Sequence, residues 1–354
     1  MLDGFRIVCV TPAGRRRYMR LLVPQILSEG IVDEYQIWMN TEDRHDLHFF
    51  NELGHIPKIK LVPQPKGTVD GRFSICDFFA GCIDPKTIYI RFDDDIVWIE
   101  PGSIRSIAET RIRDRDSFLI SAAVVNNAVF TNIFQVLGLY DDNEYVHTNA
   151  FDKIGWESGP FAAKLHRHAL DLIGRGQLSA LRFGSRPLAQ VRFSINCISW
   201  RGDMFSTFAG RVDREEEEYL TVTKPCRMGA INRVDGQAIV CHFAFYSQRD
   251  YLDKTDILVG YLKQVAAATW IDTTLRDAVE RAFLLVEGSN RAAMEPSVTR
   301  SRPRWEISNI VSSLHIPYLR LRLEWMRPGD YKRRWARKFR KWNLIPTTDI
   351  QSGK

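Results

Sequence analysis

Residues 87–98 read TIYIRFDDDIVW, an apolar run that reaches three consecutive aspartates and then turns apolar again. The β-branched and aromatic residues before the aspartates predict a buried strand. Two carboxylates about 4 Å apart repel each other by roughly 1 kcal/mol in water and by about 4 kcal/mol in a protein-like medium, so three of them require a cation nearby. A magnesium or manganese ion held by carboxylate oxygens meets this need. A solvated turn is the alternative, which the apolar sequence on both sides disfavours.

The composition is that of a folded globular protein, with 354 residues, 45% of them hydrophobic and 26% charged. This length predicts one large domain with an appendage, or two domains. The six cysteines form no Cys-x-x-Cys pair, and most lie in apolar runs, which predicts reduced core residues in the cytosol. An acid at Asp3 argues against a signal peptide, and no apolar run has the length of a membrane span.

The first hundred residues alternate between strand and helix patterns. The expected strands cover residues 5–10, 35–39 and 59–62, and the expected helices cover 16–27 and 72–79. This alternation predicts an α/β fold with a mostly parallel sheet flanked by helices. Ligands of such sheets bind beyond the carboxyl ends of the strands. If the first and fourth strands are neighbours, residues 11–15 and 93–95 lie at one edge.

The loop Thr11-Pro12-Ala13-Gly14-Arg15 is a candidate nucleotide site. A small turn with glycine lets backbone amides approach a nucleotide, and the arginines that follow can pair with phosphates. The spacing matches neither the G-x-G-x-x-G nor the G-x-x-x-x-G-K-[ST] pattern, so a dinucleotide site or a P-loop is unsupported. A simple helix entry with exposed arginines explains the same residues equally well.

The strand and helix alternation followed by Asp93-Asp94-Asp95 resembles the nucleotide-sugar-binding half of the GT-A-fold glycosyltransferases of bacterial envelope polysaccharide assembly. The resemblance covers roughly the first 250 residues. It implies a nucleotide-sugar donor, with a UDP-sugar favoured, and Mn²⁺ or Mg²⁺ as a Lewis acid on the departing diphosphate. By the same resemblance Asp93 and Asp95 bind the metal. The donor is expected to contact Thr11, Pro12, Ala13, Arg15, Arg72, Asp93 and Asp94.

Residues 213–221, DREEEEYLT, place four glutamates against an apolar turn, similar to the acidic element that GT-A enzymes set under the acceptor. A general base must lie within hydrogen-bond distance of the acceptor hydroxyl. We expect Glu218 to be this base, then Glu217, with Glu157 as the alternative. A carboxylate base favours inversion at the anomeric carbon. A solvated helix face is the competing interpretation of the glutamates.

Residues 239–246, IVCHFAFY, form another strand-like run with one histidine. A lone histidine in such a run is more often a hydrogen-bonded core residue than a metal ligand. The resemblance nevertheless implies that His242 completes the metal shell, because many GT-A enzymes use a histidine from the end of the catalytic domain. An imidazole beside carboxylates favours manganese over magnesium.

Residues 146–149 and 153–160 are the candidate acceptor region, because they combine aromatic, amide and charged groups with turn residues. The ring of Trp156 suits a sugar face, although it suits the core equally. The catalytic domain is expected to cover residues 1–265, with a nucleotide-sugar half at 1–100 and an acceptor half at 101–265. Residues 266–354 are expected to form a helical C-terminal region.

Residues 331–342 combine four aromatic residues at helical spacing with seven of the chain's 49 lysines and arginines. The rest of the chain is nearly neutral, since it holds 43 acidic residues, and this argues against a nucleic-acid surface. A basic amphipathic helix fits an anionic membrane surface. Packing on the domain and nucleic-acid binding are the alternatives. The preferred location is cytoplasmic, peripheral on the inner face of the membrane.

Together these patterns predict a metal-dependent glycosyltransferase acting on a saccharide or lipid-linked saccharide acceptor. A sugar-nucleotide nucleotidyltransferase is the enzymatic alternative, because it also binds a nucleotide and a divalent metal. Such an enzyme would normally show a glycine-rich basic loop after its first strand, and residues 11–17 match such a loop poorly. The alternative without catalysis is a metal- or glycan-binding membrane adaptor.

Overall fold

The structure of the protein, a computed structural model, describes residues 1–67, 69 and 71–294, and the side chains of these except 71–73 and 289–294. Residues Met1–Met294 form one compact unit, and the boundary expected at residue 265 stays a prediction. The predicted membrane-binding segment 331–342 lies outside the described residues. Among the described residues, every helix is too short or too polar to traverse a lipid bilayer.

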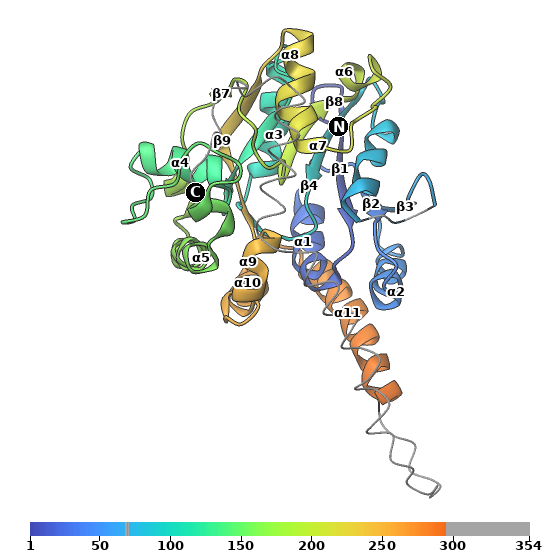
Figure 1. Cartoon of the computed structure of the whole chain (residues 1–354). Helices are drawn as coiled ribbons and strands as arrows, with labels where there is room; N and C mark the ends of the chain where they lie inside the picture. The colour runs from blue at the N-terminus through green and yellow to red at the C-terminus, as the bar shows by residue number, and fades with distance from the viewer. Residues whose placement is uncertain (68, 70, 295–354) are drawn as a thin grey trace, which may run out of the picture. The chain divides into compact units, whose positions relative to one another are not determined.

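The described residues form a nine-stranded sheet (Figure 1). Its strands are β1 (Arg6–Ala13), β2 (Glu34–Met39), β3 (Ile59–Pro63), β4 (Thr87–Phe92), β5 (Ile96–Ile99), β6 (Ile120–Val125), β7 (Arg186–Leu188), β8 (Cys197–Arg201) and β9 (Asn232–His242). The order is β3-β2-β1-β4-β8-β6-β9-β5, and β7 pairs with β9. The pairs from β3 to β4 are parallel, as is β6 with β9. The expected α/β fold is confirmed.

Strand β4 has the central place that its composition predicts. All six of its residues are buried, because β1 lies on one side and β8 on the other. The first and fourth strands are neighbours, which was the condition for residues 11–15 and 93–95 to lie at one edge, and Val10 is in register with Arg91. The pairing changes from parallel to antiparallel across β4, and the three aspartates begin where this strand ends. The strand order β3-β2-β1-β4 also reverses between β1 and β4, and open sheets place their ligands at such a reversal.

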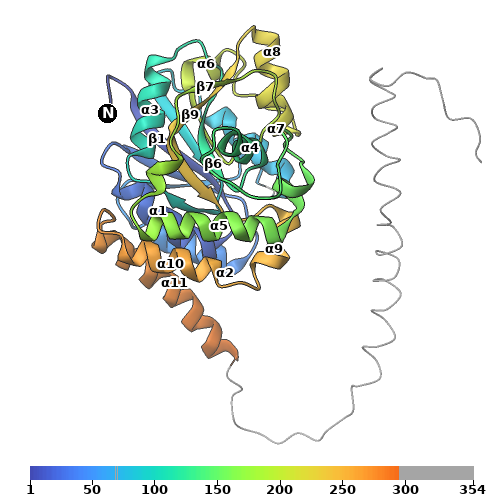
Figure 2. The ribbon, with the colours of Figure 1, turned by 90° about the vertical axis from the view of Figure 1, so that its left-hand side faces the viewer.

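Helices cover the sheet. They are α1 (Arg16–Ser28), α2 (Arg44–Leu53), α3 (Ser103–Arg113), α4 (Ala128–Val136), α5 (Gly159–Gly174), α6 (Gly202–Ser206), α7 (Glu216–Glu218), α8 (Lys224–Met228), α9 (Tyr246–Leu252), α10 (Ile257–Ala267) and α11 (Thr273–Met294). The helix expected over 72–79 is the 3₁₀ helix η1 (Gly71–Gly81), η3 (Leu178–Leu181) is a second, and η2 (Lys153–Glu157) and η4 (Tyr219–Thr223) are π-helical turns. Helix α10 packs on α5, and α11 packs along α1 and α2 (Figures 1 and 2).

Five of the six cysteines are buried and all six are free, in agreement with the expected reduced core residues. Cys226, on α8, is the exposed one. The apolar core is continuous from β1 and α1 to β9 and α10. The sheet and its helices therefore form a rigid support for the loops at the carboxyl edge of β1 and β4.

Candidate functional site

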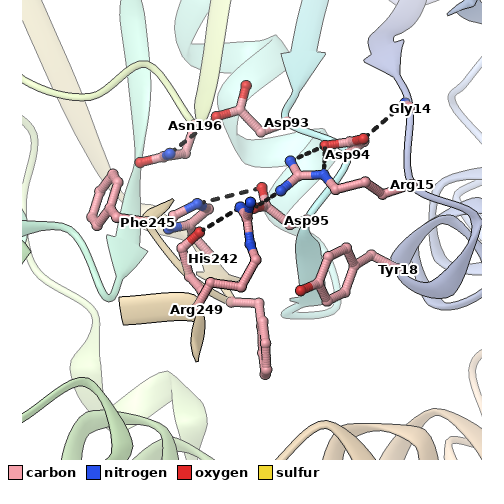
Figure 3. Close-up of polar contacts among 12 residues, drawn as sticks. Gly14, Arg15, Tyr18, Asp93, Asp94, Asp95, Asn196, His242, Phe245 and Arg249 are labelled. Atoms are coloured by element: carbon pink, nitrogen blue, oxygen red, sulfur yellow. Dashed lines mark hydrogen bonds and ion pairs between the residues drawn. The ribbon is translucent and has the colours of Figure 1, made fainter. Parts of the chain in front are cut away.

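The three aspartates after β4 contact three different neighbouring segments (Figure 3). Asp93 accepts a hydrogen bond from the side-chain amide of Asn196 at 3.0 Å, on the β8 side. Asp94 accepts one from the backbone amide of Gly14 at 2.8 Å, in the loop after β1. Asp95 is 3.3 Å from the Nε2 atom of His242, at the end of β9. The aspartate run thus joins the parallel half of the sheet to the mixed half.

Arg15 links the loop after β1 to this run. Its Nε atom donates to Asp94 at 2.9 Å, and its Nη1 atom lies 2.8 Å from Asp95. The predicted meeting of residues 11–15 and 93–95 is therefore observed. Thr11, Pro12 and Ala13 lie on β1 and are buried, and the hydroxyl of Thr11 accepts a hydrogen bond from Tyr35 at 2.9 Å. Arg72 lies in η1, and its side chain is outside the described residues.

Asp93, Asp95 and His242 form a group that can hold a metal ion, because each offers one ligand atom within 4.8 Å of the others. The Nδ1 atom of His242 lies 3.3 Å from the backbone oxygen of Asn126. A carbonyl oxygen only accepts, so Nδ1 carries the hydrogen and Nε2 is left facing Asp95. Two carboxylates and one imidazole nitrogen are a suitable donor set for Mn²⁺, and for Mg²⁺ less so. These residues fit the cation that the sequence predicts.

Positive groups surround Asp95. Arg15 and Arg249 both reach its Oδ2 atom, at 2.8 Å and 3.3 Å, and Figure 3 shows them converging on it with His242. Burial alone raises the pKa of Asp95, but Arg15 and His242 outweigh burial and lower it. Burial lowers the pKa of His242, but Asp95 outweighs this effect and raises it. The carboxylate form of Asp95 and the protonated form of His242 thus stabilise each other, and a metal ion bound to Nε2 would take the place of that proton.

A second charged group lies beside the first, built on the buried Arg91 of β4. The Nη2 atom of Arg91 is 2.8 Å from Asp93, and its two Nη atoms donate to the two carboxylate oxygens of Glu216 at 3.2 Å. Burial raises the pKa of Glu216 to about 7, against the opposing effect of Arg91. Glu216 is thus a largely buried carboxyl, with its side chain 15% exposed, whose pKa lies near neutral pH, and Arg91 links it to the metal-ligand candidate Asp93.

The other glutamates of this run lie differently. Glu217 and Glu218 both pair with Arg192, at 3.5 Å and 3.4 Å. Burial raises the pKa of Glu217, whereas the side chain of Glu218 is 43% exposed. Glu157 is exposed at the end of η2. The assignment of the base to Glu218, Glu217 or Glu157 stays a prediction. Glu216 was missed, although a lone arginine within the strand of residues 87–92 indicated that a buried acid must pair with it.

Aromatic side chains extend from the metal-ligand candidates toward solvent. The ring of Phe245 lies 4.6 Å from that of His242 and 6.2 Å from that of Trp156. Trp156 in turn packs edge-on against Tyr246 at 5.1 Å and Phe151 at 5.2 Å. Tyr246 is 73% exposed and Phe151 is 41% exposed. We call these four residues (Phe151, Trp156, Phe245 and Tyr246) the aromatic surface.

Comparison with known proteins gives structural likenesses alone. No protein-family model and no curated protein matches the chain. Solved structures found include a mycobacterial protein (11% identity, 74% of this chain and 76% of that one, TM-score 0.40). They also include glucosyl-3-phosphoglycerate synthase from Mycobacterium tuberculosis in complex with Mn²⁺, UDP and phosphoglyceric acid (14% identity, 74% of this chain and 79% of that one, TM-score 0.39). Another is CMP:2-keto-3-deoxy-manno-octonic acid synthetase with CTP (10% identity, 74% of this chain and 98% of that one, TM-score 0.39). At these TM-scores the likenesses carry no argument about this chain.

Proposed function

We propose that this chain is a divalent-metal-dependent glycosyltransferase that moves a sugar from a nucleotide-sugar to a saccharide or lipid-linked saccharide. The observation that carries the proposal is the group Asp93, Asp95 and His242, with ligand atoms within 4.8 Å, at the edge where β1 and β4 end. Asp95 and His242 are buried and Asp93 is partly buried, so the fold holds the group in place before any ligand binds. It lies where open α/β sheets bind nucleotides.

Asp93, Asp95 and His242 would hold Mn²⁺ or Mg²⁺, which would supply Lewis-acid stabilisation of the charge on a departing diphosphate. The chain adds its own cations at the same place. The guanidinium groups of Arg15 and Arg249 are about one-third exposed and both contact Asp95, so they are within reach of a phosphate bound beside it. The amide of Gly14 fixes the loop through Asp94.

The acceptor hydroxyl needs a base and a surface on which its sugar ring can rest. Glu216 combines a pKa near 7 with a position beside Asp93 through Arg91, so it joins Glu218, Glu217 and Glu157 as a candidate base. The aromatic surface contacts His242 through Phe245 and reaches solvent at Tyr246, which gives an acceptor sugar a ring to stack on. A carboxylate base supports inversion at the anomeric carbon.

The test combines nucleotide binding with product analysis. UDP, GDP and CMP are titrated calorimetrically into the protein with and without Mn²⁺, and the protein is then incubated with sugar donors and glycan acceptors. We expect one nucleotide to bind in a metal-dependent way, and a nucleoside diphosphate or monophosphate to be released only with an acceptor. Pyrophosphate release from a nucleoside triphosphate and a sugar phosphate would instead identify a nucleotidyltransferase. Metal-independent or absent nucleotide binding by folded protein would refute the proposal.

We propose that the protein binds its acceptor at a membrane surface. The support is the basic, aromatic composition of residues 331–342, which fits an anionic membrane surface. Removal of this segment is expected to weaken binding to anionic vesicles and to leave transfer to a soluble acceptor unchanged. Equal vesicle binding by the shortened protein would contradict this part of the proposal.

A further inference from the structure

Two consecutive asparagines follow β6, and both are buried behind the metal-ligand candidates. Asn126 is 0% exposed and Asn127 is 1% exposed. Neither belongs to the group that can hold a metal, yet each is linked by hydrogen bonds to a different member of it. We infer that Asn126 and Asn127 are positioning residues that hold the two sides of a divalent-cation site in register, an inference that rests on the proposed function.

Asn126 holds the end of β9. Its backbone oxygen accepts from Nδ1 of His242 at 3.3 Å, and its side-chain amide donates to the backbone oxygen of Phe243 at 2.9 Å. The same amide donates to Gln248 of α9 at 3.0 Å. One residue therefore fixes both the ring of His242 and the peptide that follows it. The Nε2 atom of His242 is directed to Asp95 as a consequence.

Asn126 adopts a conformation that needs a reason. Its φ angle is +63°, in the left-handed region that most residues avoid and asparagine tolerates. Its Oδ1 atom is buried with no hydrogen-bond partner among the described residues. Both features disfavour the folded state, and strained or unpaired groups of this kind concentrate at functional sites. The contacts of Asn126 with His242 and Phe243 explain why the fold keeps this unfavourable conformation and the unpaired Oδ1 atom.

Asn127 holds the other side through a second amide. Its Nδ2 atom donates to Oδ1 of Asn196 at 2.9 Å and to the backbone oxygen of Ser194 at 3.0 Å. Because Oδ1 of Asn196 is thereby occupied, its Nδ2 atom faces Asp93 and donates to it at 3.0 Å. The Oδ1 atom of Asn127 accepts from the backbone amide of Val129 and caps α4. The orientation of one buried amide thus determines the orientation of the next, and that of Asp93.

The adjacency of the two residues is what gives them a joint role. Asp93 follows β4 and His242 ends β9, two strands that do not pair with each other, and the sheet links them through Ile96 of β5, which pairs with His242. A single peptide unit between Asn126 and Asn127 connects the supports of both. Outer contacts that orient metal ligands commonly change metal affinity when they are removed. The pair therefore adds a second connection between Asp93 and His242, beside the pairing of β5 with β9.

The test measures Mn²⁺ affinity of the full chain by calorimetric titration, beside thermal unfolding without metal. Asn127→Asp keeps the oxygen that caps α4 and removes the donor to Asn196. Asn126→Gly keeps the positive φ and the backbone oxygen and removes the amide that holds Phe243. Asn232→Asp is the matched control, because Asn232 is equally buried and its amide donates to the backbone oxygens of Leu220 and Thr221.

We expect each test variant to bind Mn²⁺ about 10-fold more weakly than the wild type, and the control to bind it as the wild type does. The negative charge added in Asn127→Asp by itself attracts a cation and should increase the Mn²⁺ affinity. A lower Mn²⁺ affinity in this variant would therefore result from the changed geometry of the ligands. Wild-type affinity in folded Asn126→Gly and Asn127→Asp would overturn the inference, as would an equal loss in the control. If Asn127→Asp does not fold, Asn126→Gly decides. Absence of Mn²⁺ binding in the wild type would overturn the proposed function as well, whereas altered transfer with unaltered Mn²⁺ affinity would overturn the inference alone.

Discussion

Replacing Asp95 by asparagine is expected to destabilise the metal-free protein. The carboxylate is 2% exposed and accepts from Arg15 at 2.8 Å and from Arg249 at 3.3 Å, with His242 also at 3.3 Å. Breaking a buried ion pair by removing one partner costs roughly 3–5 kcal/mol. Because Arg15 keeps Asp94 as a partner and the asparagine oxygen still accepts, we expect the lower end, about 3 kcal/mol, or on the order of 5–10 °C in Tm.

The assay is thermal unfolding with EDTA and again with Mn²⁺. Free Mn²⁺ at about 100 times its Kd should stabilise the wild type by about 2.7 kcal/mol and the Asp95→Asn variant by much less. The control is Asp253→Asn, which removes an ion pair of 3.1 Å with the more exposed Arg17 and should cost less than about 1 kcal/mol. If Asp95→Asn were as stable as this control and gained as much from Mn²⁺ as the wild type, both the charge balance around Asp95 and its role as a metal ligand would be refuted.

Three further outcomes are expected. Burial raises the pKa of Glu216 from 4.5 to about 7, so its contribution to stability is present below 4.5 and is lost as the pH rises through 7. Urea unfolding should show a decline of up to about 3 kcal/mol over this range that Glu216→Gln abolishes, and an unchanged slope in the variant would contradict the assignment. Tyr246→Ala should raise the KM for a glycan acceptor about 10-fold at unchanged nucleotide affinity, since the exposed ring supports little of the fold; a change in nucleotide affinity instead would contradict the acceptor role. Gly14→Ala should weaken nucleotide binding about 10-fold, because a Cβ atom would lie 2.9 Å from the backbone oxygen of Asn40 and displace the amide that binds Asp94. Wild-type nucleotide affinity in this variant, measured by calorimetry, would exclude the loop from the site.

The first half of the fold could be predicted from the sequence because its patterns are local. Strand and helix runs alternate within the first hundred residues, and the crossover rule then predicts a parallel sheet. That β1 lies beside β4 was a condition of the site prediction, and the structure meets it. The second half follows no such rule. Strand β8 pairs antiparallel with both β4 and β6, and β9 accepts three partners, so its order depends on contacts between residues far apart in the chain.

The candidate site, like the fold, could be predicted from the sequence only in part. Asp93, Asp95 and His242 were predicted as metal ligands by resemblance, and the structure brings their ligand atoms together. Arg249 was not predicted, because a single arginine on a short helix gives no pattern that distinguishes it from a surface residue. The choice among the four glutamates also depended on packing, since only the structure shows that Glu216 pairs with Arg91.

Arginine side chains around the three aspartates offset the repulsion among the carboxylates. In the sequence alone the run is three mutually repelling carboxylates that require a cation nearby. In the structure, Arg15, Arg91 and Arg249 supply a positive charge for each aspartate, and Asp95 is held by two of them. The protein's own cations therefore stabilise the site in the absence of metal. A bound divalent cation would then add positive charge that an anionic diphosphate can balance, so metal and nucleotide should each increase the affinity for the other.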